Sequence, residues 1–250
     1  LLPSCAEAQE IRLVETYTSP VVEMRDLFGA AVARGGDLDG DGTPDLLVGA
    51  DGADQVYLLS GTSDEVIRVY DSPNPESETS FGEALALVGD IDGDGTPDLL
   101  VGAPDETAHG GAGQAYLLSG TSSEVIRTLN APNPEDGDSF GAAVAGVGDI
   151  DGDSISDLLV GAEGAGQAYL LSGTSGEVIQ TFTSPNAQER GSFGSAVARA
   201  GDFNGDGMTD FLIGARKEYP DGEDEAGRVY LLSGNSGKTI RTFTSQTKTR

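Results

Sequence analysis

The chain repeats one pattern four times. Phe-Gly recurs at residues 28, 81, 140 and 193, at spacings of 53, 59 and 53 residues. Each copy continues with alternating small and apolar residues, an Asp-rich loop, a short apolar run ending in Gly-Ala, a Tyr-Leu-Leu-Ser-Gly sequence and a β-branched segment. The apolar segments have the length of strands, and Gly, Pro, Asn and Asp separate them. We therefore predict four short strands in each copy.

A period of about 53 residues with four strands is typical of the blades of a β-propeller. Two sandwich domains would not repeat the same turn chemistry four times. The sequence predicts an all-β fold, a β-propeller of four-stranded antiparallel blades within residues 10–250. The four predicted units run from about 21–72, 73–131, 132–184 and 185–245.

One strand-like segment is left over once the four complete units are counted. Residues 13–20 resemble residues 178–185, the fourth strand of the third unit, although residues 239–244 already complete the last unit. The chain therefore has a surplus outer strand at about 11–19. It closes a ring, forms an extra edge, or pairs with another subunit, because an uncovered edge strand is a template for association.

The four Asp-rich loops span residues 37–45, 90–98, 149–157 and 202–210, with side-chain oxygens at positions 1, 3, 5 and 9. Such clustered carboxylates repel one another unless a cation neutralises them, and Ca²⁺ takes about six to eight oxygen ligands. We predict up to four Ca²⁺ sites, in which position 7 contributes its carbonyl and water completes the shell. The predicted ligands are Asp37, Asp39, Asp41, Thr43 and Asp45; Asp90, Asp92, Asp94, Thr96 and Asp98; Asp149, Asp151, Asp153, Ile155 and Asp157; and Asp202, Asn204, Asp206, Met208 and Asp210.

These loops are not EF-hands, which need a bidentate Glu at position 12. Position 12 is an apolar residue of the next strand in every loop, so each loop is a hairpin between two strands. Ser154 in the third loop replaces a turn glycine, and Asn204 in the fourth removes one charge, so we expect weaker binding in both. The position-12 residues are Val48, Val101, Val160 and Ile213.

Three motifs together, Phe-Gly, Asp-x-Asp-Gly-Asp-Gly-x-x-Asp and Gly102-Ala103-Pro104, resemble the FG-GAP repeats of the integrin α-subunit propeller. The resemblance covers about nine-tenths of the chain. It implies a calcium hairpin between the first two strands of each blade, with ligand recognition on the opposite face or the rim. The sequence departs from the family because only one unit keeps the Pro of Gly-Ala-Pro, and integrin heads close with more blades than four.

Composition limits the partners. The 42 acidic and 14 basic residues give a net charge of −28, which repels nucleic acid, and no apolar run is long enough for a membrane-spanning helix. Residues 1–9 have the pattern of a processed secretory or lipoprotein signal, either with a cut after Ala8 or with a lipid anchor at Cys5. The alternative is a plain flexible N-terminus. We predict an extracellular or cell-surface protein.

Catalytic motifs are missing from the sequence. The single His109 lies in a Gly-rich loop, and no nucleophile elbow, phosphate-binding loop or zinc motif occurs. The four Tyr residues of Tyr-Leu-Leu-Ser are expected in the blade cores. The connection after Gly-Ala is short at 51–54 and 163–166 but long at 104–113 and 216–227, as expected for variable binding loops.

The sequence therefore predicts a calcium-stabilised, non-enzymatic propeller for adhesion or protein–protein contact. One alternative is a self-assembling subunit of an extracellular fibre or surface layer that uses the surplus strand. A weaker alternative is a non-catalytic module that accompanies an enzyme.

Overall fold

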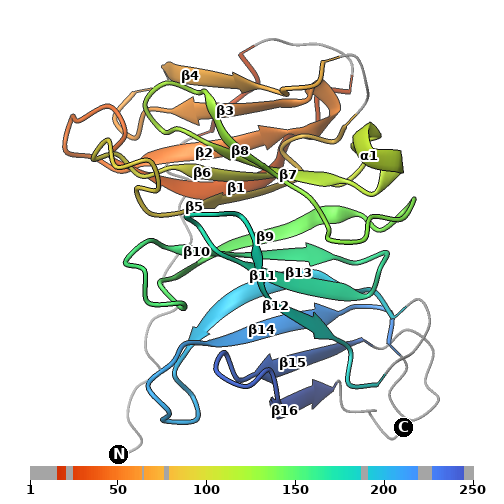
Figure 1. The fold of residues 1–250 in the computed structure, drawn as a ribbon. Coiled ribbons are helices and arrows are strands. Elements are labelled where there is room, and N and C mark those ends of the chain that lie inside the picture. Colours follow the sequence, from red (N-terminus) through yellow and green to blue (C-terminus); the bar gives the residue numbers. More distant parts are fainter. Residues whose placement is uncertain are drawn as a thin grey trace, which may run out of the picture.

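The computed structural model describes residues 16–20, 25–63, 65–75, 79–186, 191–218 and 227–244. These residues form four antiparallel sheets, each of four strands that pair in sequence order (Figure 1). The strands are β1 (Phe28–Gly36), β2 (Asp45–Ala50), β3 (Gln55–Leu59) and β4 (Val66–Asp71) in blade 1; β5 (Ala84–Leu87), β6 (Leu99–Ala103), β7 (Gln114–Leu118) and β8 (Val125–Leu129) in blade 2; β9 (Phe140–Gly148), β10 (Asp157–Ala162), β11 (Gln167–Leu171) and β12 (Val178–Thr183) in blade 3; and β13 (Phe193–Gly201), β14 (Asp210–Ala215), β15 (Arg228–Leu232) and β16 (Thr239–Thr244) in blade 4.

The predicted all-β fold of four-stranded blades is confirmed. The helical content of the described residues is limited to a four-residue helix α1 (Ala108–Gly111), which contains His109, and a single 3₁₀ turn η1 (Asp51–Ala53). Continuous apolar runs form the two middle strands of each blade because blades cover both of their faces. Every residue of β6 and β7 is buried for this reason.

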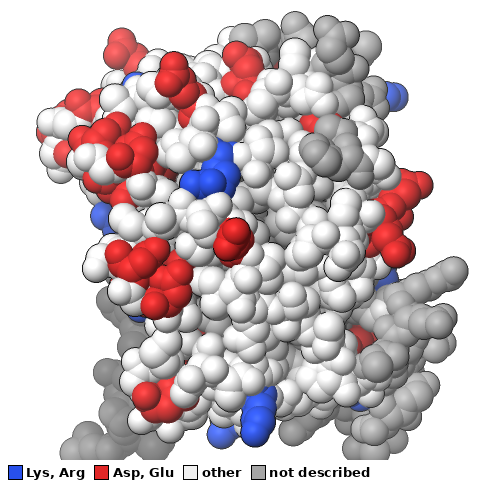
Figure 2. Space-filling model, in the orientation of Figure 1, with Lys and Arg blue, Asp and Glu red and all other residues white. Residues whose placement is uncertain are grey.

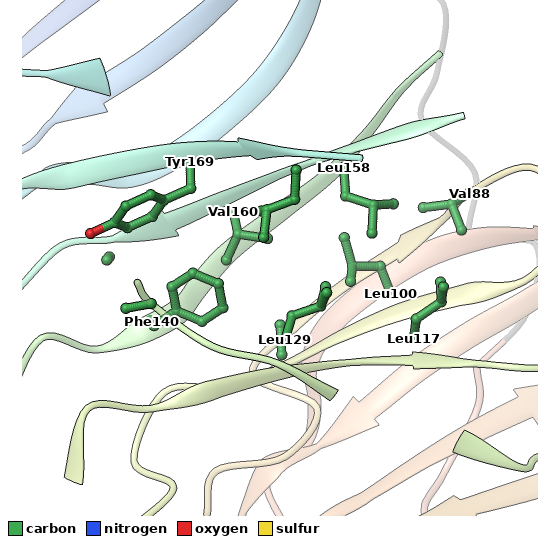
Figure 3. Packing of buried hydrophobic residues seen from close by; sticks show 12 residues of the cluster. Val88, Leu100, Leu117, Leu129, Phe140, Leu158, Val160 and Tyr169 are labelled. Carbon is green, nitrogen blue, oxygen red and sulfur yellow. The ribbon is translucent and has the colours of Figure 1, made fainter. Parts of the chain in front are cut away.

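Successive blades pack face to face. We call the face of a blade that carries the Phe of Phe-Gly its front face, and the opposite face its back face. Leu100, Leu117 and Leu129 on the back of blade 2 pack against Phe140 and Tyr169 on the front of blade 3 (Figure 3). The predicted core position of the four Tyr residues is confirmed, since Tyr57, Tyr116, Tyr169 and Tyr230 are at most 4% exposed.

The four blades form a stack in which blade 1 and blade 4 lie at opposite ends (Figure 1). The inner strands β1, β5, β9 and β13 are in contact one after the other. The hairpins between the first and second strands lie together at one edge of the stack, on the left of the view, and α1 lies at the other edge. The acidic loops are therefore on one side, and the long connection at residues 104–113 is on the other.

Residues 16–20 lie against the front face of blade 1, where Tyr17 packs beside Phe28 and Leu46. These five residues form no strand, and residues 11–15 of the predicted surplus strand lie outside the described residues. Tyr17 aligns with Phe182 in the sequence, which packs on Phe211 of the next blade with ring centroids 5.6 Å apart. Tyr17 thus takes the position that the fourth strand of a preceding blade would fill.

Candidate metal centre

The first acidic loop connects β1 to β2 and is folded by its own carboxylates. Asp37 accepts hydrogen bonds from the backbone N–H groups of Gly40 (2.8 Å) and Gly42 (3.0 Å), and Asp39 accepts one from Asp41 (3.0 Å). Gly40 and Gly42 have φ of 81° and 91°, which explains the glycines at these positions. As a result, Asp37, Asp39 and Asp41 each place a carboxylate oxygen within 4.8 Å of the others.

The second loop repeats this arrangement, and the third has a similar cluster in which position 9 stands in place of position 5. Oxygens of Asp90, Asp92 and Asp94 lie within 4.8 Å of one another, and so do oxygens of Asp149, Asp151 and Asp157. Acidic side chains accordingly gather at the edge of the molecule that carries the hairpins (Figure 2).

In the fourth loop, Asn204 stands between Asp202 and Asp206. Its side-chain N–H donates to Asp206 over 3.0 Å, so the amide partly neutralises a carboxylate that an ion would otherwise neutralise. The weaker binding expected of the fourth loop remains a prediction.

Position 9 differs from the other acidic positions because its carboxylate is buried. Asp45 accepts a hydrogen bond from Leu38 N–H in the loop (2.8 Å) through one oxygen and from Gly61 N–H in the β3–β4 turn (3.1 Å) through the other. The same two bonds recur in the other three blades. The position-9 carboxylates, each 0% exposed, belong to Asp45, Asp98, Asp157 and Asp210.

Burial and hydrogen bonds shift the pKa values of these carboxyls in opposite directions. Desolvation by burial raises the pKa of Asp98 and of Asp157 above the ordinary value for Asp. The exposed position-5 carboxyls shift the other way, since the hydroxyl of Thr62 lowers the pKa of Asp41, and the hydroxyl of Thr174 lowers that of Asp153. The position-5 groups therefore stay ionised to lower pH.

Comparison with known families identifies the repeat. The model of the FG-GAP repeat matches residues 28–70, 81–118, 140–171 and 193–232, more than half of the chain. The chain is an FG-GAP repeat protein.

The relatives of this FG-GAP protein include integrin α subunits. It is 36% identical to mouse integrin alpha-E over 159 residues, 54% of this chain and 13% of that protein. It is 38% identical to human integrin alpha-10 over 152 residues, which cover 54% of this chain and 13% of that protein. It is 29% identical to Xenopus laevis integrin alpha-5 over 211 residues, which cover 75% of this chain and 20% of that protein. The FG-GAP protein is thus integrin-α-like, but spans no more than a fifth of the length of these subunits.

A solved structure shares the fold of the FG-GAP protein. The crystal structure of BBS1N in complex with ARL6DN, soaked with lead, superposes with a TM-score of 0.53 at 14% identity, covering 86% of this chain and 56% of that chain. At this identity the likeness concerns the fold alone.

Within the described ranges, nine of the predicted ligands of the FG-GAP protein come together in three clusters of carboxylates, and none of these clusters lies in the fourth loop. Positions 1, 3 and 5 come together in the first two loops, and positions 1, 3 and 9 in the third. The donors are all oxygens, which suits a hard cation such as Ca²⁺ and does not suit zinc. The position-7 carbonyls of Thr43, Thr96, Ile155 and Met208 remain predicted ligands.

The sequence analysis missed the β3–β4 turn as part of the site. The Thr62 hydroxyl donates to Asp41 over 2.7 Å, the Thr174 hydroxyl donates to Asp153 over 2.6 Å, and the Asn235 amide approaches Asp206 at 3.4 Å. A signal was present, because Ser-Gly-Thr-Ser recurs three times and Ser-Gly-Asn-Ser once, always after Tyr-Leu-Leu.

Proposed function

We propose that this FG-GAP protein is an extracellular calcium-binding propeller module for adhesion or protein–protein contact, in which Ca²⁺ is a structural element. The observation that carries the proposal is the oxygen cluster of Asp37, Asp39 and Asp41, repeated in register by the second loop. Carboxylates this close repel one another, and a divalent cation removes that repulsion.

The position of the loops supports a structural role for the ion. Each loop joins the two inner strands of a blade, and its position-9 carboxylate is hydrogen-bonded to the turn between the two outer strands. An ion held by the loop therefore stabilises the hairpin between the two inner strands and, through the position-9 carboxylate, the turn between the two outer strands. Binding to the folded state alone contributes about 1.4 kcal/mol per site at a tenfold excess of Ca²⁺ over Kd.

The charge and the exposed loops support an extracellular location. Extracellular calcium modules bind with Kd values of roughly 0.1 to 1 mM, which only the extracellular Ca²⁺ concentration saturates. A net charge of −28 also makes the apoprotein strongly self-repulsive. The proposed processing of residues 1–9, with a lipid anchor at Cys5 as one form, concerns a segment outside the described residues.

Contact with a protein ligand is assigned to the edge opposite the acidic loops. The long connection at residues 104–113, with α1, lies there. Variable loops on a rigid repeat scaffold are where binding surfaces form. We propose binding rather than catalysis because His109 in α1 is the single histidine and has no catalytic motif around it.

Isothermal titration with CaCl₂ tests the proposal. We expect up to four ions per chain, with the first two loops filling first. Asp39→Asn and Asp92→Asn should each remove one site, whereas Glu124→Gln, an exposed acidic residue outside the loops, should remove none. No heat of binding at millimolar Ca²⁺, or equal losses in all three variants, would contradict the proposal.

A further inference from the structure

We propose that the back face of blade 4 binds the front face of blade 1 of a second copy of this chain. Within the stack, the back face of one blade packs on the front face of the next blade three times. The two end faces are the same two kinds of surface. The inference rests on the fold and is independent of the calcium proposal.

A close backbone approach defines the contact between successive blades. A Cβ atom built on Gly49, Gly102 or Gly161 would lie 2.0 Å from the carbonyl oxygen of the Phe-Gly glycine in the next blade. These positions must therefore be glycine. The partner glycines are Gly82, Gly141 and Gly194.

Blade 4 has the same glycine, although among the described residues no further blade packs against it. In the part of the chain that the structure describes, a Cβ built on Gly214 would meet nothing nearer than the Cβ of Ala196 of its own blade, at 3.3 Å. Val229 is 39% exposed and Phe243 is 44% exposed, whereas their counterparts in the other three blades are at most 3% exposed. The counterparts are Val56, Ala115 and Ala168 for Val229, and Tyr70, Leu129 and Phe182 for Phe243.

Blade 1 has the complementary half. Among the described residues, a Cβ built on Gly29, the glycine of the first Phe-Gly, would meet nothing within 4 Å, although those of the other three Phe-Gly glycines would lie 2.1 to 2.9 Å from a backbone oxygen of the preceding blade. Val32 on the same face is 75% exposed, while the equivalent Val144 and Val197 are partly buried in the contacts between blades.

Both end faces are hollowed. A depression of about 510 Å³ on blade 4 is lined by Gly214, Val229 and Phe243, and one of about 470 Å³ on blade 1 is lined by Phe28 and Val32. Within the stack, Phe-Gly of one blade fills the corresponding space on the blade before it. The depression on blade 4 therefore lies at the position that a Phe-Gly segment fills in the other blades.

Charge also matches the two ends. In the blade 2–blade 3 contact, Arg127 of β8 donates to the carbonyl of Thr174 in the next blade over 2.5 Å. Arg241 is its counterpart in blade 4, and its guanidinium lies 5.9 Å from the Phe243 ring. The turn that Arg241 would meet on a second copy contains Thr62 and the exposed Glu65. An acidic partner turn would thus face a basic residue.

A second copy is the occupant because one chain carries both halves. Such a contact is heterologous, so it either closes into a ring or continues as a chain. Propellers close with about four to eight blades, and two copies supply eight. For residues 1–250 we therefore expect a closed dimer of about twice their mass of 25.6 kDa.

Docking must displace residues 16–20. Tyr17 now occupies the place on the front face of blade 1 that Phe243 of the second copy would take. This segment competes with the second copy, so we expect association at micromolar concentrations or above.

Sedimentation velocity of the full chain from 1 to 500 μM, in 5 mM CaCl₂ and in EDTA, tests the proposal. We expect a dimer fraction that grows with concentration wherever circular dichroism shows a folded chain and, if Ca²⁺ binds, a higher midpoint in EDTA, because the net charge of −28 is then not reduced by the ion. Val229→Lys and Val32→Lys should each shift the midpoint at least tenfold upward. Ile179→Lys, at a site also 39% exposed but outside the end faces, should leave it unchanged.

Three results would overturn the proposal. A chain that stays a folded monomer at every concentration would show that the end faces do not dock. A dimer that survives Val229→Lys uses another surface. Tyr17→Ala should raise the dimer fraction, and a fall would show that residues 16–20 form the contact themselves.

Discussion

The backbone N–H of Gly173 donates a hydrogen bond to the carboxylate of Asp157 over 3.1 Å. The other oxygen of Asp157 accepts a bond from Ile150 N–H over 2.7 Å. One buried side chain therefore joins the acidic hairpin of blade 3 to the turn between its two outer strands. The same carboxylate lies in the oxygen cluster of the third loop, so it has a structural role with or without an ion.

We predict that Asp157→Ala destabilises the protein in EDTA by about 2 to 4 kcal/mol, because it removes the acceptor of three backbone N–H groups, those of Ile150, Asp151 and Gly173. Asp153→Ala is the matched control, since Asp153 is exposed and its loss should matter mainly when Ca²⁺ is present. Urea unfolding with and without Ca²⁺ measures both. Equal losses for the two variants in EDTA would show that position 9 has no structural role of its own.

A second prediction concerns the glycines of Gly-Ala. Gly49→Ala should cost about 3 kcal/mol because its Cβ would lie 2.0 Å from the Gly82 carbonyl oxygen. Gly214→Ala should change the stability of the monomer by less than about 1 kcal/mol, because its Cβ has space. Chemical unfolding below the concentration of association compares the two variants. A large loss for Gly214→Ala would mean that blade 4 is packed differently.

A third prediction concerns the third loop. Ser154 has φ of 74°, a left-handed conformation that costs a non-glycine residue roughly 1 kcal/mol. The second loop has Gly95 at this position, with φ of 94°. Ser154→Gly should therefore raise the melting temperature in EDTA by a few degrees, and Gly95→Ser should lower it. If both substitutions move it in the same direction, backbone strain does not distinguish the loops.

A fourth prediction concerns alkaline pH. Burial raises the pKa of Tyr70 to about 12, and also raises the pKa of Tyr169 and Tyr230. The neutral phenol is favoured in the folded state, so the stability that Tyr70 contributes is complete below pH 10 and is lost as the pH rises from 10 through 12.

Tyrosinate absorbance reports this titration without interference, since the chain has no Trp. The native protein should show a late component near pH 12 that is missing in denaturant and is smaller by one tyrosine in Tyr70→Phe, because the pKa values of Tyr169 and Tyr230 are also raised. Titration of all the tyrosines near pH 10 in the native state would contradict the buried contact of the Tyr70 hydroxyl with the Gly120 carbonyl, at 3.3 Å.

The repeats made most of the fold predictable. Each Phe-Gly marked the inner strand of a blade, and the apolar position 12 correctly placed Val48 in β2 and Val101 in β6. The surplus strand was less predictable: residues 16–20 resemble a strand in sequence, but no neighbouring strand of their own blade lies beside them in the described residues. Sequence similarity predicted an outer strand, and it did not predict that Tyr17 packs on the front face of blade 1.

Contacts between blades were the part that sequence reasoning missed. Glu106 belongs to a long surface loop, where a solvated carboxylate is the usual expectation, yet it is 0% exposed. It accepts hydrogen bonds from Asn74 of the preceding connector (2.8 Å) and from the Tyr116 hydroxyl (3.1 Å). Glu218 has the same role toward Tyr230 and Ser184.

A weak signal for these glutamates existed. Both long loops carry Glu three residues after Gly-Ala, and the short loops of blades 1 and 3 do not. Burial of a charge in such a loop depends on a connector more than thirty residues away in sequence, as the Asn74–Glu106 bond shows. Local sequence patterns do not show which distant connector lies beside the loop in the folded protein.

Thermal unfolding in 5 mM CaCl₂ and in EDTA tests the central claim most directly, with MgCl₂ as the control cation. Four filled sites should contribute about 5 kcal/mol, so we predict a melting temperature at least about 10 °C higher in Ca²⁺ than in EDTA, and little change in Mg²⁺. Identical melting curves in Ca²⁺ and EDTA would contradict the assignment of the acidic hairpins as structural calcium sites.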